Sequence, residues 1–229
     1  MTRRIPRLAA ALVSATLLAT MAVTAVSAHD LGSDHDRDHG RGLAWALDAV
    51  RDATERFEDV NTAIAAGYAQ PPAPAPLHEC ISSFDGTGAM GFHFINGSLL
   101  DTTLDPRNPE VLVYAPDRGG RLHLVALEYV VFQAPWMAIH GSTMPSLFHQ
   151  MFMTTGDPNR FEIPAFFSLH VWLFKHNPSG LFAPFNPMVS CDPGHRGPWH
   201  DARPSAGQTA LRFACDIDRA ISRSSTSRT

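Results

Sequence analysis

The fold of this chain depends above all on one apolar run, Leu122 to Phe132, which reads LHLVALEYVVF. The run is rich in β-branched and aromatic residues and longer than most strands of soluble proteins. Side chains alternate between the two faces of a strand. The face that carries Glu128 should also carry Leu124, Ala126 and Val130. A carboxylate in such apolar surroundings is costly to bury without a partner, so this predicted strand also carries a candidate site residue.

Three further runs predict strands: Met90–Ile95, Val111–Tyr114 and Leu169–Phe174. Arg118-Gly119-Gly120 supplies a hairpin turn immediately before the long run. The connections are short, which favours antiparallel pairing. Within the longer excursion 133–168, a proline near the first turn predicts a short helix from about Pro145 to Met153.

Residues 43–66 show the clearest helical pattern, with apolar side chains spaced to line one face. These are Leu43, Leu47, Val50, Phe57, Val60 and Ile64. Gly67 follows as a C-terminal stop. We expect this amphipathic helix to pack on an antiparallel β-sheet or partly closed β-barrel, and residues 175–200 to wrap the sheet as a proline-rich C-terminal coil. The predicted fold class is therefore α+β.

The N-terminus has the pattern of a signal peptide over residues 1–28, with three arginines, an apolar stretch and a small-residue cleavage site ending at Ala28. An uncleaved anchor is the alternative. Residues 29–42, rich in His and Asp, predict a disordered segment with weak affinity for divalent metals at most. We expect one α+β domain over residues 43–221 and a disordered tail over 222–229.

Charge and composition limit the partners. Removing the three leader arginines leaves 15 basic and 22 acidic side chains, a net charge of −7. No basic stripe is present to neutralise phosphates, which argues against nucleic acid. No second apolar stretch is long enough to span a membrane. The sequence thus predicts a soluble bacterial protein, secreted or periplasmic, and leaves its oligomeric state open.

The three cysteines of an exported chain allow one disulfide bond and one free thiol. Cys80 and Cys191 flank the strand-rich region, whereas Cys215 lies nearer the polar tail. The pairing Cys80–Cys191 is favoured, and Cys80–Cys215 stays open.

Two histidines lie inside predicted strands, His93 and His170, and Glu128 lies in a third. If the faces that carry them meet, two imidazoles and one carboxylate converge. That set suits zinc with an open position, or iron as a facial triad, and copper is a third possibility. His78, Glu79 and His123 could add ligands, although His123 falls on the face opposite Glu128.

A structural interpretation stands beside the metal hypothesis. Each histidine could bond a backbone carbonyl, and Glu128 could pair with an arginine such as Arg121 or Arg212. Nucleophilic catalysis has less support: Ser168 and His170 lie on one strand face, too far apart for a direct hydrogen bond. No catalytic residue can be assigned from the sequence.

Several segments together resemble a group of exported bacterial proteins of unknown function, over roughly residues 45–192. They are Phe57–Val60, Ala66–Tyr68, Cys80, Met90–Phe94, Pro109–Tyr114, Val125–Tyr129, Leu169–Phe174 and Asn177–Gly180. The resemblance implies export and one compact domain, and it implies no activity.

Three functional hypotheses follow. The first is an exported protein whose His/Glu site, His93, Glu128 and His170, binds a divalent metal or a small ligand. The second is a metal-dependent enzyme of cupin-like chemistry that uses the same residues. The third is a structural or interaction module with no metal site.

Overall fold

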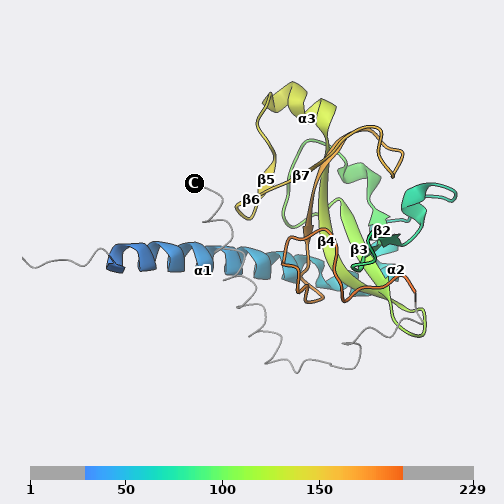
Figure 1. Ribbon diagram of the computed structural model, residues 1–229, viewed down its shortest axis with the longest axis horizontal. Helices are drawn as coiled ribbons and strands as arrows, with labels where there is room; N and C mark the ends of the chain where they lie inside the picture. The colour runs from blue at the N-terminus through green and yellow to red at the C-terminus, as the bar shows by residue number, and fades with distance from the viewer. Residues whose placement is uncertain (1–28, 193–229) are drawn as a thin grey trace, which may run out of the picture.

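The computed structural model describes residues 29–192, and its centre is a curled antiparallel sheet of six strands (Figure 1). The strand order is β1-β2-β3-β4-β8-β7. The strands are β1 (Ile81–Ser82), β2 (Ala89–Ile95), β3 (Val111–Pro116), β4 (Leu122–Phe132), β7 (Met153–Thr155) and β8 (Phe166–Val171). The predicted antiparallel sheet is confirmed, and mixed α+β describes the fold.

The long strand β4 begins and ends at the predicted residues and lies between β3 and β8. Its register slips beside Val113, where Tyr114 pairs with Leu124 but Val113 pairs with Ala126. The extra residue, Val125, forms a β-bulge, which shifts the alternation of side chains by one. Leu124 consequently packs on the face opposite Ala126, and the prediction that it shares a face with Glu128 is wrong.

The predicted helix 43–66 is divided into three pieces. Helix α1 spans His29–Thr54, η1 is a 3₁₀ turn over Glu55–Glu58, and α2 spans Val60–Ala65. At the break, the buried Thr54 hydroxyl donates to the Val50 carbonyl (2.8 Å), a bond that tends to bend helices. Asp59 then caps α2 by accepting from the Asn61 amide. Gly67 ends the region with φ of 95°, as predicted.

Helix α1 starts well before the predicted Leu43, so the expected disorder of residues 29–42 is not what the structure describes. Once a helix is nucleated, each added residue gains a backbone hydrogen bond, so a packed C-terminal half can propagate backwards. That half is packed: Leu43, Leu47 and Val50 are buried against the sheet, while the first part of α1 extends away from it (Figure 1). Ile64, predicted on the apolar face, is 53% exposed.

The segment between β4 and β8 differs most from its prediction. A helix does form, but it is α3, Gln133–His140, directly after β4. The predicted helix from Pro145 is instead a small hairpin of β5 (Ser146–Leu147) and β6 (Gln150–Met151). Its two turn residues, Phe148 and His149, both have positive φ, although neither is one of the residues, Gly, Asn or Asp, that usually mark such a hairpin turn.

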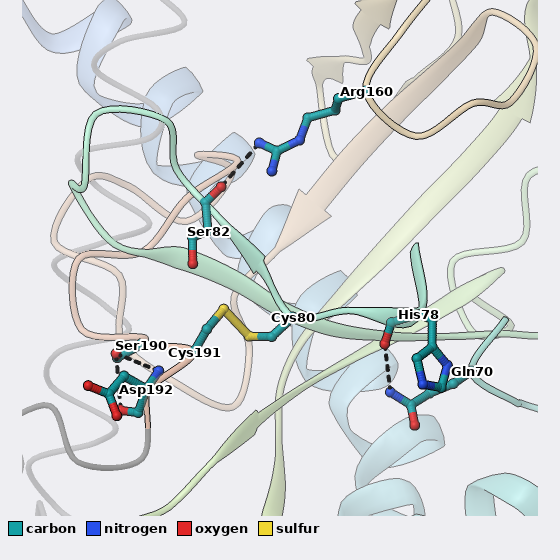
Figure 2. The surroundings of a disulfide bond; sticks show 8 residues. All are labelled: Gln70, His78, Cys80, Ser82, Arg160, Ser190, Cys191 and Asp192. Carbon is teal, nitrogen blue, oxygen red and sulfur yellow. Dashed lines mark hydrogen bonds between the residues drawn. A yellow bond between two sulfur atoms is a disulfide. The ribbon is translucent and has the colours of Figure 1, made fainter. Parts of the chain in front are cut away.

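The disulfide bond joins Cys80, just before β1, to Cys191 in the segment after β8 (Figure 2). The favoured pairing is therefore confirmed, and Cys215 lies outside the described residues. From Trp172 to Asp192 the described chain contains no helix or strand, in agreement with the predicted coil. Buried asparagines hold it: Asn177 donates to the Phe185 carbonyl and Asn186 to the His176 carbonyl.

Strand β8 begins three residues earlier than predicted and ends at Val171. The short turns η2 (Pro76–His78) and η3 (Gly97–Leu99) complete the described elements. The predicted signal peptide 1–28, the C-terminal part of the predicted domain (193–221) and the tail 222–229 lie outside the described residues.

Candidate metal centre

The three predicted site residues come from three strands of the sheet. Glu128 on β4 is directly paired with His170 on β8. His93 on β2 is separated from β4 by β3, where its partner is Val113 and the partner of Glu128 is Val111. Because a curled sheet brings side chains on its concave face together, His93 and Glu128 meet across these two small valines. The predicted convergence of the three side chains is seen.

One glycine allows the strands to approach at this point. Gly91 lies two residues before His93 with φ of 123°, and a Cβ there would lie 2.4 Å from the Tyr114 carbonyl oxygen. Only glycine fits such a close backbone approach. Gly91 thus lets β2 lie against β3 in the segment that positions His93.

Glu128 stands between the two histidines. Its Oε2 lies 3.4 Å from His93 Nε2, and its Oε1 lies 3.5 Å from His170 Nδ1. The imidazole rings are nearly perpendicular, with centroids 6.1 Å apart. Both distances are longer than the usual 2.9–3.0 Å of a hydrogen bond between nitrogen and oxygen.

All three side chains are buried, with residue exposures of 3% for His93, 6% for Glu128 and 3% for His170. The outer ring nitrogens, His93 Nδ1 and His170 Nε2, have no hydrogen-bond partner of ordinary geometry among the described residues. Buried polar atoms without a partner are rare in folded proteins and call for an explanation. Here two of them belong to one cluster.

Burial decides the charge of the cluster. It lowers the pKa of His93 to about 4, although Glu128 and, weakly, the Gly91 backbone act in the opposite direction. Burial also lowers the pKa of His170 to about 3. It raises the pKa of Glu128, against the pull of His93 and of a hydrogen bond from Ser168. Both imidazoles are therefore neutral at pH 7, which is the form that binds metals.

The donor atoms suit a metal ion. One ligand atom from each residue lies within 4.8 Å of the other two. Ligands of a tetrahedral zinc ion with bonds of about 2.0–2.1 Å are about 3.3 Å apart, close to both His–Glu distances. The buried cluster could hold a metal ion.

A cavity of about 330 Å³ lies against the cluster on the same face of the sheet. All three site residues line it, and most of the other lining residues are apolar. Two lining residues, Met153 and Glu162, are exposed, which places the mouth of the cavity beside them. The combination of an apolar cavity and a few convergent polar groups is typical of small-molecule sites.

The other predicted ligands lie elsewhere. The His78 ring interacts with the Pro71 carbonyl oxygen at 2.7 Å. His123 is exposed and pairs with Asp117 at 2.9 Å. Neither these histidines nor Glu79 belongs to the cluster. Arg121, an alternative partner for Glu128, pairs with Asp117 instead, and Arg212 lies outside the described residues.

Glu110, directly before β3, is a buried carboxylate that the sequence patterns did not single out. It is 2% exposed, and its Oε2 accepts a hydrogen bond from the Val130 amide at 3.0 Å. Burial raises its pKa to about 7. The available signal was a carboxylate directly before the apolar run Val111–Tyr114, but its backbone partner depends on tertiary register.

Comparisons with known proteins add no function: no family model, no curated protein and no solved structure matches this chain. Within the described residues, no helix combines the length and apolar character needed to cross a bilayer. The geometry of the site is therefore the basis on which a function can be assigned.

Proposed function

We propose that this protein binds a divalent metal ion through His93 Nε2, His170 Nδ1 and the carboxylate of Glu128, whose two oxygens each face one of the histidines. The observation that carries the proposal is the spacing of the donors. Distances of 3.4 and 3.5 Å are long for hydrogen bonds but match the separation of ligands around one ion. Neutral imidazoles buried around a carboxylate also support it, because they can bind without first losing a proton.

Zinc, iron and copper all accept two imidazoles and one carboxylate. Three protein ligands leave at least one coordination position for water or a small molecule, and the cavity beside the cluster favours such a ligand. The same feature supports the second candidate, a metal-dependent enzyme of cupin-like chemistry, since catalysis needs an open position that solvent and substrate can reach.

The proposed location is outside the cytoplasm, in the periplasm or secreted. The Cys80–Cys191 disulfide supports this, because such bonds persist in oxidising compartments. The sequence of residues 1–28 supports it independently through its signal-peptide pattern.

The test is the metal content of untagged protein purified after export. We expect close to one bound ion per chain in the wild type, and none in a His93→Ala/His170→Ala variant beyond what the His/Asp-rich residues 29–42 retain. Because the variant keeps those residues, the difference between the two proteins isolates the buried site. Glu128→Gln, which preserves side-chain size, should weaken retention during dialysis.

His123→Ala is the matched control, since that histidine is exposed and pairs with Asp117. It should leave the metal content unchanged. Circular dichroism must show that each variant is folded. Equal metal content in the wild type and the double variant, after reconstitution with zinc, iron or copper, would favour the structural module instead.

A further inference from the structure

The cavity beside the candidate metal centre has its own chemistry, and it indicates what kind of molecule completes the site. Its inner wall is formed by the sheet, through Ile95, Val111, Val130, Phe132 and Phe166. Residues outside the sheet, such as Leu77 of η2 and Ile163 of the segment between β7 and β8, complete the lining. A volume of about 330 Å³ is at the lower end of the range of small-molecule sites, roughly 300–1,000 Å³. The walls therefore suit the apolar part of a small ligand.

The net charge of the metal centre indicates which chemical group of a ligand would bind to the metal. A divalent ion carries +2, the Glu128 carboxylate −1, and the neutral histidines nothing, which leaves +1 at the end of an apolar cavity. Among the described residues, the cavity wall offers one further carboxylate, Glu162, and this side chain is exposed at the mouth. A buried charge is costly unless it is paired. An anionic ligand on the open coordination position would remove the imbalance, whereas a neutral one would not.

Resting on the proposed function, we infer that the site takes a small monocarboxylate with an apolar chain: the carboxylate binds the metal, and the chain lies along the cavity wall. Ser168 already donates to Glu128, which keeps that carboxylate oriented toward the histidines. The ligand thus supplies the second negative charge of the centre.

The mouth of the cavity allows such a ligand to enter. Glu162 is in water, where its repulsion of an anion is screened. Arg160 lies two residues away, with its guanidinium 5.7 Å from the ring of Phe161, a lining residue. Arg160 also donates to the Ser82 carbonyl (Figure 2). The loop that carries the negative charge of Glu162 therefore also carries the positive charge of Arg160.

The experiment uses the full chain loaded with cobalt(II), whose visible spectrum reports changes in the ligands of the metal. Metal content is measured first, and acetate, butanoate, hexanoate and octanoate are then titrated. We expect the spectrum to change with each acid. We also expect the affinity to rise about fourfold per methylene until the chain fills the cavity. The primary alcohol of the same length should bind at least tenfold more weakly.

Ile163→Trp places a larger side chain in the part of the cavity wall outside the sheet, and Ile163 is not one of the three proposed ligands. It should retain the metal and lose the gain in affinity for the longer acids. Bound cobalt with no spectral response to any carboxylate, or with equal affinity for acetate and octanoate, would overturn the inference and leave the metal site intact. Failure to bind cobalt in the wild type, while the protein is folded, would reject the metal site and this inference with it.

Discussion

The two faces of the sheet satisfy their buried polar groups to different degrees. On the face covered by α1, η1 and α2, the hydroxyls of Tyr68, Tyr114 and Tyr129 each donate to a backbone carbonyl. Their acceptors are Pro109, Phe57 and Pro106, at 2.8, 2.6 and 2.6 Å. We call this the helix face. Its large side chains and their polar groups pack without a ligand.

On the concave face, which we call the cavity face, the buried polar groups contact mainly one another. Glu128 lies at 3.4 and 3.5 Å from two histidines, and each histidine keeps one ring nitrogen without a hydrogen-bond partner of ordinary geometry among the described residues. Folding alone gives no reason to place these groups in an apolar wall, because each costs free energy to bury. The contrast supports the proposal that the cavity face binds a ligand, whereas the helix face is packed without one.

The largest effect should come from removing the cross-link that supports the cavity face. Cys191 packs against buried apolar residues of the cavity face, a group that includes Ala89 and Val189, and its bond to Cys80 closes a separation of 111 residues. Cys80→Ser/Cys191→Ser should lower the free energy of unfolding by about 4–5 kcal/mol in the chain-entropy model. Urea denaturation at pH 7 measures it.

Cys215→Ser is the control and should leave the unfolding midpoint unchanged, because the structure pairs the other two cysteines. If it destabilised the protein as much as the double variant, the bridge would involve Cys215. Hydrogen exchange should also rise more in the coil after β8 than in β3 and β4, if the bridge mainly supports the cavity face.

A second prediction compares the two buried carboxylates. Glu110 has a backbone partner and lies near the helix face, where its charge helps raise the pKa values of Tyr68 and Tyr129. Burial raises its own pKa from 4.5 to about 7. The folded protein therefore binds a proton more tightly than the unfolded chain, so the stability it contributes is present below pH 4.5 and lost as the pH rises through 7.

Glu110→Gln cannot ionise but can still accept from the Val130 amide. Its stability relative to the wild type should rise by about 3 kcal/mol between pH 4 and 8. Denaturation of both metal-free proteins across that range measures the difference, in which the opposite contributions of His93 and His170 cancel. A difference independent of pH would mean that Glu110 has an ordinary pKa.

Much of the cavity face followed from the sequence because strand alternation is a local rule. His93, Glu128 and His170 each interrupt an apolar run, which singled them out as candidates, but whether the faces that carry them meet depended on the pairing of the strands. The start of β4 was equally clear, since a proline- and glycine-rich turn precedes it.

What the sequence missed depends on tertiary contacts. The bulge at Val125 inserts one extra residue into β4 and so changes which side chains share a face. Nothing in the order of residues in LHLVALEYVVF predicts where it occurs. The helix break at Thr54 depends on a side-chain bond to the Val50 carbonyl. Glu110 has a buried hydrogen-bond partner, the Val130 amide, only because the register of β3 leaves that amide without a strand partner. The positive φ of Phe148 and His149 has no compositional signal.

The smallest effect is also the most direct comparison of the two faces. Val130 and Val131 are neighbours on β4 with the same side chain and the same strand propensity. Val131 is 1% exposed on the helix face, whereas Val130 is 7% exposed and lines the cavity. Val131→Ala should cost about 2–3 kcal/mol, because truncation removes buried methyl groups and leaves a new void.

Val130→Ala should cost only about 1 kcal/mol, because its side chain already borders open space and has fewer atoms packed against it. Urea denaturation of the metal-free variants, with circular dichroism to confirm the fold, gives both values. Metal content should be unchanged in each, since neither side chain is a donor. Equal costs would mean that the cavity closes in solution, and the cavity face would then be as well packed as the helix face.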